Sequence, residues 1–308
     1  MKFQKTLVAV AIAGIAAVPM IASADTTLSG VVQIQATGND SDGDAGDLRI
    51  AAGDVLFGIA TEHELNSGLT GYGSLRVDMN RLSNEGAMTA DPFNTPENDE
   101  DDIDLGSSVG TADSVYVGVK GGFGDLRFGE VANGVEVAQV ANDLFDVTSD
   151  TNGGIGYTGS FGPVGLTLNF SPEAQNNEDV IGAGITFGVG GFSIALGAED
   201  RAEIQSSAVG ASFAFSGASI SAHYWTRDDA TDTESFAVKV GYGFGGVSAT
   251  LSAAQQDGTN IDNSAVRLDL VYDLGGGFDI SSRITSATNN NDASEDQVSY
   301  RVQLSKAF

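Results

Sequence analysis

The sequence lacks cysteine and contains only two histidines and few basic residues. Without cysteine, neither a disulfide framework nor a thiolate metal site can form. Only 14 lysines and arginines stand against 42 aspartates and glutamates, which gives a formal net charge of −28. Nucleic-acid binding depends on the neutralisation of phosphates by basic side chains, so this charge balance excludes nucleic acid as a partner.

Long apolar runs are also absent after the first 24 residues. The chain begins with basic Lys2 and Lys5, continues with an apolar segment that ends at Ile21, and then has the small residues Ala22-Ser23-Ala24. This order is typical of a secretory signal peptide. The apolar segment is shorter than the about 20 residues that a membrane-spanning helix needs. We therefore predict a cleaved signal peptide at 1–24 and a single domain at 25–308.

Apolar and polar residues alternate along most of the remaining chain, a pattern that predicts β-strands. In the last segment, Tyr300 and Val302 lie on one face and Arg301 and Gln303 on the other. Such segments give sixteen predicted strands: 26–37, 48–62, 68–81, 111–121, 124–131, 153–159, 164–171, 179–188, 191–200, 203–215, 217–227, 233–243, 246–255, 263–273, 277–287 and 297–308. Tight glycine-rich turns alternate with longer polar loops, which is typical of transmembrane barrels with short periplasmic turns.

Aromatic residues support the same fold without use of the alternation. Eight of them lie beside predicted short turns or at the C-terminus, as a girdle at a membrane interface requires: Phe187, Phe192, Phe215, Tyr242, Phe244, Tyr272, Phe278 and Phe308. About sixteen strands leave an aqueous lumen inside a closed barrel. We therefore predict an all-β transmembrane antiparallel barrel, with a smaller barrel of about fourteen strands as the structural alternative.

Two hairpins and the last strand contain recognisable motifs. The segments Phe57–Gly73 and Val115–Gly129 resemble the second hairpin and the hairpin before the third loop in enterobacterial members of the Gram-negative general porins. Phe308, on an alternating strand, resembles the assembly signal that the barrel-assembly machinery recognises. The resemblance implies a sixteen-strand homotrimer among outer-membrane lipids and lipopolysaccharide, with the third loop folded into a water-filled lumen that small hydrophilic solutes and ions cross passively.

The resemblance also implies a constriction formed by the third loop. This loop is expected at about 132–152, and its acidic residues are Glu136, Asp143, Asp146 and Asp150. Family members place arginines on the opposite wall, and here the chain departs from the pattern. Asp113 stands near one expected arginine, and Glu130 follows Gly129 where related porins often have arginine.

A different basic wall follows from the positions of residues along the predicted strands. Five basic residues have inward parity at similar distances from the periplasmic ends of their strands, Lys239 slightly lower: Arg76, Lys239, Arg267, Arg283 and Arg301. Opposite the loop acids they would create a transverse field, although scattered, solvated charges are the simpler interpretation. Acidic outer loops would enrich cations near the opening, so we predict a modest cation preference.

Neither catalysis nor cofactor binding is predicted. His63 lies beside a predicted periplasmic turn and His223 lies on an inward face with Trp225, at different heights, so they share neither a metal site nor a triad. The acidic run 97–104 could bind Ca²⁺ or Mg²⁺, but it lacks the ordered spacing of an EF-hand loop, and a solvated loop is the favoured interpretation. The resemblance to porins implies a second loop that reaches a neighbouring subunit, so divalent ions that bridge subunits or lipopolysaccharide stay open as an alternative. We predict no enzyme, cofactor or resident metal.

Two other functions remain as alternatives. A substrate-specific channel would carry a continuous aromatic track, for which inward Trp225 and Tyr72 are too few. A structural or adhesive barrel would bind partners through its loops and have a plugged pore. The predicted location is the outer membrane, reached through the general secretory pathway.

Overall fold

The computed structural model describes residues 25–41, 44–45, 48–65, 67–79, 111–141, 144–145, 151–175, 178–202, 204–289 and 297–308. The predicted signal peptide at 1–24, the acidic run 97–104 and the loop acids Asp143, Asp146 and Asp150 lie outside these residues. Among the described residues, no helix has the length and apolar character needed to cross a lipid bilayer.

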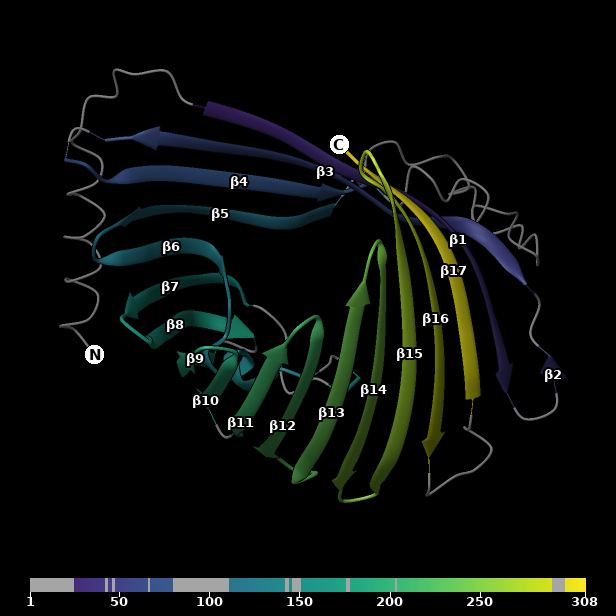
Figure 1. The fold of residues 1–308 in the computed structure, drawn as a ribbon. Coiled ribbons are helices and arrows are strands. Elements are labelled where there is room, and N and C mark those ends of the chain that lie inside the picture. The colour runs from purple at the N-terminus through teal and green to yellow at the C-terminus, as the bar shows by residue number, and fades with distance from the viewer. Residues whose placement is uncertain are drawn as a thin grey trace, which may run out of the picture.

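The fold is one antiparallel sheet that closes on itself (Figure 1). Each long strand pairs with the next along the chain, and β1 pairs with both β3 and β17, which closes the ring. The strands are β1 (Asp25–Ser41), β2 (Asp44–Ala45), β3 (Arg49–Glu64), β4 (Thr70–Asp78), β5 (Thr111–Gly121), β6 (Gly124–Val131), β7 (Thr151–Phe161), β8 (Val164–Gln175), β9 (Glu178–Val189), β10 (Phe192–Arg201), β11 (Ile204–Phe215), β12 (Ala218–Asp228), β13 (Thr233–Phe244), β14 (Val247–Gly258), β15 (Ile261–Gly275), β16 (Phe278–Asn289) and β17 (Gln297–Ala307).

The predicted sixteen-strand barrel is confirmed. Strand β2 is only a two-residue extension paired with β1, and the other sixteen strands form the wall of the barrel. The alternative of about fourteen strands is wrong. The bounds of β5 and β6 match the prediction residue for residue, whereas β8 and β15 continue further than predicted. Backbone hydrogen bonds between strands do not require alternating apolar side chains, so a strand can continue beyond the residues that show the alternation.

One external connection is shorter than predicted. The external connection between β14 and β15 consists only of residues 259–260, as short as the opposite turn at 216–217. In that turn Ser216 and Gly217 have φ angles of 49° and 82°. Two consecutive positive φ values match the twist of a tight hairpin, which explains the glycine.

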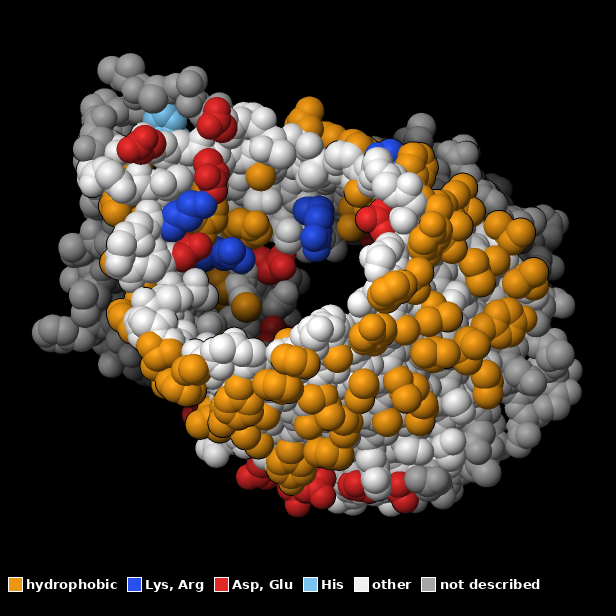
Figure 2. Space-filling view, in the orientation of Figure 1, with side chains coloured by type: hydrophobic (Ala, Val, Ile, Leu, Met, Phe, Trp, Pro, Cys, Tyr) orange, Lys and Arg blue, Asp and Glu red, His pale blue; other side chains and the backbone are white. Residues whose placement is uncertain are grey.

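The outer wall is apolar and the inner wall is mostly polar. Aliphatic and aromatic side chains cover the outside in a continuous band (Figure 2). All eight aromatic residues of the predicted girdle are exposed on this surface, with Phe215 at 71% and Phe244 at 77%. In a soluble protein such exposure would be costly, but lipid covers the outside of a membrane barrel.

Candidate functional site

The segment after β6 leaves the wall and enters the barrel. At Gly129 the backbone has a φ of 111°, and the pairing with β7 shifts register before Val131. A Cβ at Gly129 would overlap the Val115 carbonyl oxygen of β5, so only glycine fits this bulge. The chain then forms the short 3-10 helix η2 (Gly134–Ala138) inside the ring, and the predicted inward folding of the third loop is confirmed for its described part.

A trough of small residues on the inner wall receives this loop. Gly197 of β10 and Gly210 of β11 lie so close to the loop backbone that a Cβ on either would overlap it, at Val135 and Ala138 respectively. Further along, buried alanines of β10 to β14 contact the loop: Ala195, Ala208, Ala237 and Ala254. The loop therefore packs against one side of the lumen with its main chain close to the sheet.

Three side chains on the wall hold the loop by hydrogen bonds. The Ala141 N–H donates to His223 Nδ1 at 3.1 Å, and Trp225 Nε1 donates to the Phe145 carbonyl at 2.8 Å. The Gly134 N–H donates to Asn169 Oδ1 at 2.6 Å. These bonds satisfy polar groups that the loop removes from water.

His223 and Trp225 do lie on the inner face, as predicted, but the loop buries them almost completely. His223 thus serves as an acceptor for a backbone amide. Within the described part of the chain, no group of three or more histidine and acidic side chains is arranged to hold a metal ion.

Three of the predicted basic residues lie together on adjacent strands. Arg283 of β16 is the direct cross-strand neighbour of Arg301 on β17, and Arg267 of β15 also repels Arg301 electrostatically. Acidic groups offset this charge. Arg283 forms an ion pair with Asp269, with Nε 2.5 Å from Oδ1, and Asp269 and Asp54 both attract Arg301.

The other predicted residues are distributed around the ring. Lys239 of β13 lies in the same cross-strand row as Arg267, separated from it by Ser252. Arg76 lies on β4, with β1 and β3 between it and β17. Glu136 lies on η2 inside the barrel and is half-buried.

A second group of inward charges, which was not predicted from the sequence, lies on β3 to β6. The Arg127 guanidinium lies 4.1 Å from the centre of the Tyr116 ring, and Tyr72 donates a hydrogen bond to Asp125. Lys120 forms an ion pair with Glu62. Inward parity would have identified this group, because these residues alternate with outward valines and leucines on the same strands.

Charged side chains of both signs lie along the upper and left sides of an opening in the middle of the molecule (Figure 2). The inner wall therefore combines basic and acidic groups around a passage, with the third loop against one side. A closed barrel with such an inner face can hold water throughout its length.

Comparison with known proteins agrees with this geometry. A model of the Gram-negative porin family matches residues 8–307. The chain belongs to this family. It is therefore an outer-membrane β-barrel with the channel function of a porin, and not an enzyme.

Solved porins share the fold at low sequence identity. The anion-selective porin from Comamonas acidovorans is 18% identical, with a TM-score of 0.71 over 93% of this chain and 100% of that chain. The trimer form of OmpT from Vibrio cholerae is 11% identical, with a TM-score of 0.65 over 93% and 100%. A mutant of the Rh. blastica porin is 14% identical, with a TM-score of 0.67 over 92% and 100%. No curated protein sequence matches the chain.

Proposed function

We propose that this porin is a general diffusion channel that passes small hydrophilic solutes and ions with little specificity. The observation that carries the proposal is the nature of the inner wall. Its one tryptophan, Trp225, is covered by the third loop, and the inward Tyr72 and Tyr116 form a single edge-to-face pair, so among the described residues no continuous aromatic track follows the lumen. Ser, Thr and charged side chains line it instead, and these interact with hydrated solutes about as water does.

We further propose that the channel prefers cations modestly. The arginine group at Arg267, Arg283 and Arg301 is partly neutralised by Asp269 and Asp54. Acidic residues gather at the external ends of the strands, at Asp228, Asp229, Asp232, Glu234, Asp257 and Asp262. With a net charge of −28, the potential near the opening attracts cations over about one Debye length.

The constriction in this proposal lies between the third loop and the basic wall. Glu136, Asp143, Asp146 and Asp150 form its acidic side, and Arg76, Lys239, Arg267, Arg283 and Arg301 form its basic side. Cations then pass near the loop and anions near the wall, while apolar solutes lose hydration without compensation.

Recordings from single channels in planar bilayers test both parts. In a KCl gradient we expect a reversal potential that favours K⁺, and Arg283→Gln should increase that preference because it removes the positive charge that is ion-paired with Asp269. Lys306→Gln removes the same charge from the outer face of β17, where Lys306 lies over the Phe278 ring and bonds the Gly276 carbonyl, and serves as the control. A reversal potential that favours chloride contradicts the cation preference, and absence of current from folded protein contradicts the open channel.

The assembly is proposed by analogy with the family. OmpT of Vibrio cholerae has a trimer form, and the apolar band on the outside of this barrel provides surface for subunit contacts as well as for lipid and lipopolysaccharide. We propose a homotrimer that is exported with residues 1–24 as signal peptide and inserted through Phe308 and the last strand. For a trimer we expect each inserted unit to close in three successive conductance steps of equal size. Units that close in one step contradict the trimer.

A further inference from the structure

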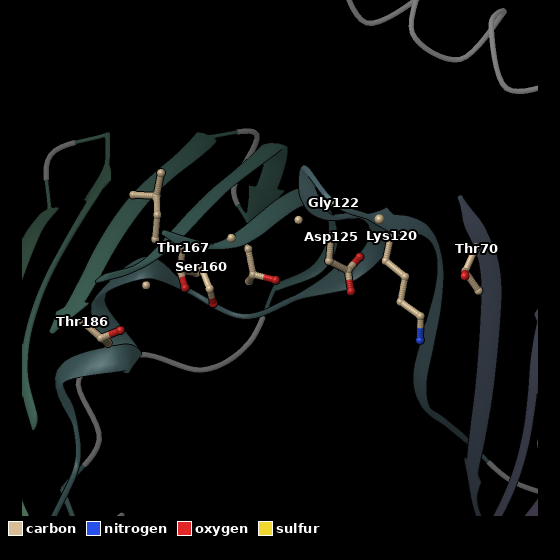
Figure 3. A pocket seen from close by; sticks show the side chains of 13 residues that line it. Thr70, Lys120, Gly122, Asp125, Ser160, Thr167 and Thr186 are labelled. Atoms are coloured by element: carbon tan, nitrogen blue, oxygen red, sulfur yellow. The ribbon is translucent and has the colours of Figure 1, made fainter. Parts of the chain in front are cut away.

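A polar hollow of about 600 Å³ lies on the inner face of β4 to β9, beside the short turn that joins β5 and β6. Hydroxyl side chains dominate its lining: Thr70, Thr158, Ser160, Thr167 and Thr186. The side chains of Lys120 and Asp125 point into the same space (Figure 3). Its volume lies within the range of small-molecule sites, about 300–1,000 Å³.

The strand register brings these residues into one continuous row. Direct cross-strand pairs lead from Thr70 to Lys120, from Lys120 to Asp125, from Asp125 to Thr158 and from Thr158 to Thr167. Directly paired side chains on one face of a sheet are about 4.5–5.5 Å apart. The row therefore presents polar groups at a spacing that neighbouring hydroxyls of one small solute can bridge.

A second row extends the polar surface. Ser160 pairs with Gly165, which pairs with Thr186. A Cβ at Gly165 would overlap the Thr186 hydroxyl. Glycine at this position therefore leaves space for that hydroxyl in the hollow. Thr158 and Ser160 are exposed to the lumen and the other three hydroxyl residues are half-buried.

The two charged groups of the hollow already have partners within the protein. Lys120 pairs with Glu62, and Asp125 accepts a hydrogen bond from Tyr72. A charged solute would have to compete with these contacts. The five hydroxyls act as both donors and acceptors, and they carry no charge that would attract an ion.

We propose that this hollow is a weak binding site for neutral polyhydroxylated solutes, such as sugars and polyols, at the periplasmic end of the channel. The site rests on the proposed diffusion function and adds a solute class to it. Exposed hydroxyls replace bonds that the solute already makes with water, so binding is weak and exchange is fast. A channel requires binding of this kind, because a tightly held solute would block it.

Titration of the ion current with glucose tests the site. With glucose on the periplasmic side of the purified porin in a planar bilayer, we expect a saturable fall in current beyond the change in bulk conductivity. The double variant Thr158→Val with Thr167→Val removes two hydroxyls and keeps β-branched shapes. Each hydrogen bond contributes about 0.5–1.5 kcal/mol, which is about two- to tenfold in affinity. Loss of two such bonds should therefore raise the half-saturating glucose concentration about fivefold or more.

The control is Thr250→Val. Thr250 is the fourth residue of β14, just as Thr167 is the fourth residue of β8, but β14 lies on a part of the inner wall that is distant from the hollow. It should leave the glucose titration unchanged, and normal KCl conductance shows that each variant is folded. A titration that does not saturate, or that is the same in the double variant, overturns the site while the diffusion function stands. Tighter binding of glucuronate than of glucose overturns the preference for neutral solutes. Wild-type protein without ion current overturns the diffusion function itself.

Discussion

At the scale of single residues, the most informative side chains are those that hold the third loop. Trp225 has no exposed surface, lies in one buried cluster with Val135 and Ala138 of the loop, and donates a hydrogen bond to the Phe145 carbonyl. In a water-filled barrel such burial occurs only where another segment covers the wall. Trp225 therefore anchors the loop and does not contact passing solutes.

Trp225→Phe is expected to loosen the loop without opening a large cavity. The phenyl ring keeps most of the apolar contact, but the Phe145 carbonyl loses its donor, which costs about 1–3 kcal/mol in a buried site. We expect greater current noise in single-channel recordings and a lower midpoint of thermal unfolding. Tyr224→Phe removes the hydrogen bond to Glu234 from the outer face of the same strand and is the control. Equal noise in both variants would contradict the anchoring role.

Asp229, in the external connection between β12 and β13, gives a prediction about pH. The Thr231 hydroxyl donates to its carboxylate at 2.5 Å, the Thr231 amide donates at 2.8 Å, and Arg227 donates at 2.6 Å. Together they hold the pKa of Asp229 below its usual value of 3.8. The carboxylate therefore stabilises the folded connection above pH 3.8, and this contribution is lost as the pH falls further, through the folded pKa.

Carboxyl-carbon NMR titration of the porin in detergent measures this directly. Wild-type Asp229 should titrate below pH 3.8, and Thr231→Val should move its pKa up towards that value because the hydroxyl donor is removed. An unchanged pKa in Thr231→Val would show that the hydroxyl is not the main cause.

At the scale of elements, the third loop and the trough that receives it depend on each other. The loop buries Val135, Ala138 and Ala141 only because the wall offers glycine and alanine at the facing positions. Larger inward residues there would hold the loop away from the sheet and narrow the passage.

Gly210→Val tests this dependence. Its side chain would overlap the Ala138 carbonyl oxygen, and overpacking of this kind costs about 1–3 kcal/mol. We expect the loop to shift towards the middle of the lumen and the single-channel conductance to fall. Gly188→Ala also adds a side chain to an inner-face position, but its Cβ has 3.8 Å to the nearest atom, so conductance should be unchanged. A normal conductance in Gly210→Val would contradict the close packing.

At the scale of the whole molecule, closure of the barrel joins the two ends of the described chain. Phe308 and Gly30 exchange two backbone hydrogen bonds of 3.0 and 3.1 Å, and the Phe308 ring lies over Gly30. The last residue thus completes the ladder between β17 and β1, so that no sheet edge at this point faces hydrocarbon.

Phe308→Ala should reduce the amount of folded porin in the outer membrane. The change removes the ring over Gly30 and the aromatic end of the last strand, and heat-dependent migration in gels of outer-membrane fractions measures the folded fraction. Tyr242→Ala is the control, since Tyr242 is a girdle residue of similar exposure within β13. An equal loss in both variants would show that Phe308 acts only as a girdle residue.

Much of this architecture was predictable from the sequence. Alternation with a period of two identifies each strand and the inward parity of Arg283, Arg301 and Trp225, because side chains of a strand point to opposite faces whatever the partner strand is. The aromatic residues near the turns fixed the position of the girdle for a similar reason. Lipid acts on each strand separately, so each strand carries the pattern by itself.

Only the tertiary structure decided how distant strands meet and what covers them. Register between strands places Arg283 beside Arg301 and Asp269, and aligns Thr70, Lys120, Asp125, Thr158 and Thr167 in one row. The loop, not the alternation, buries His223 and Trp225. Parity along a strand is a local property, whereas register and loop packing depend on the stagger between strands and on the shape of the closed ring.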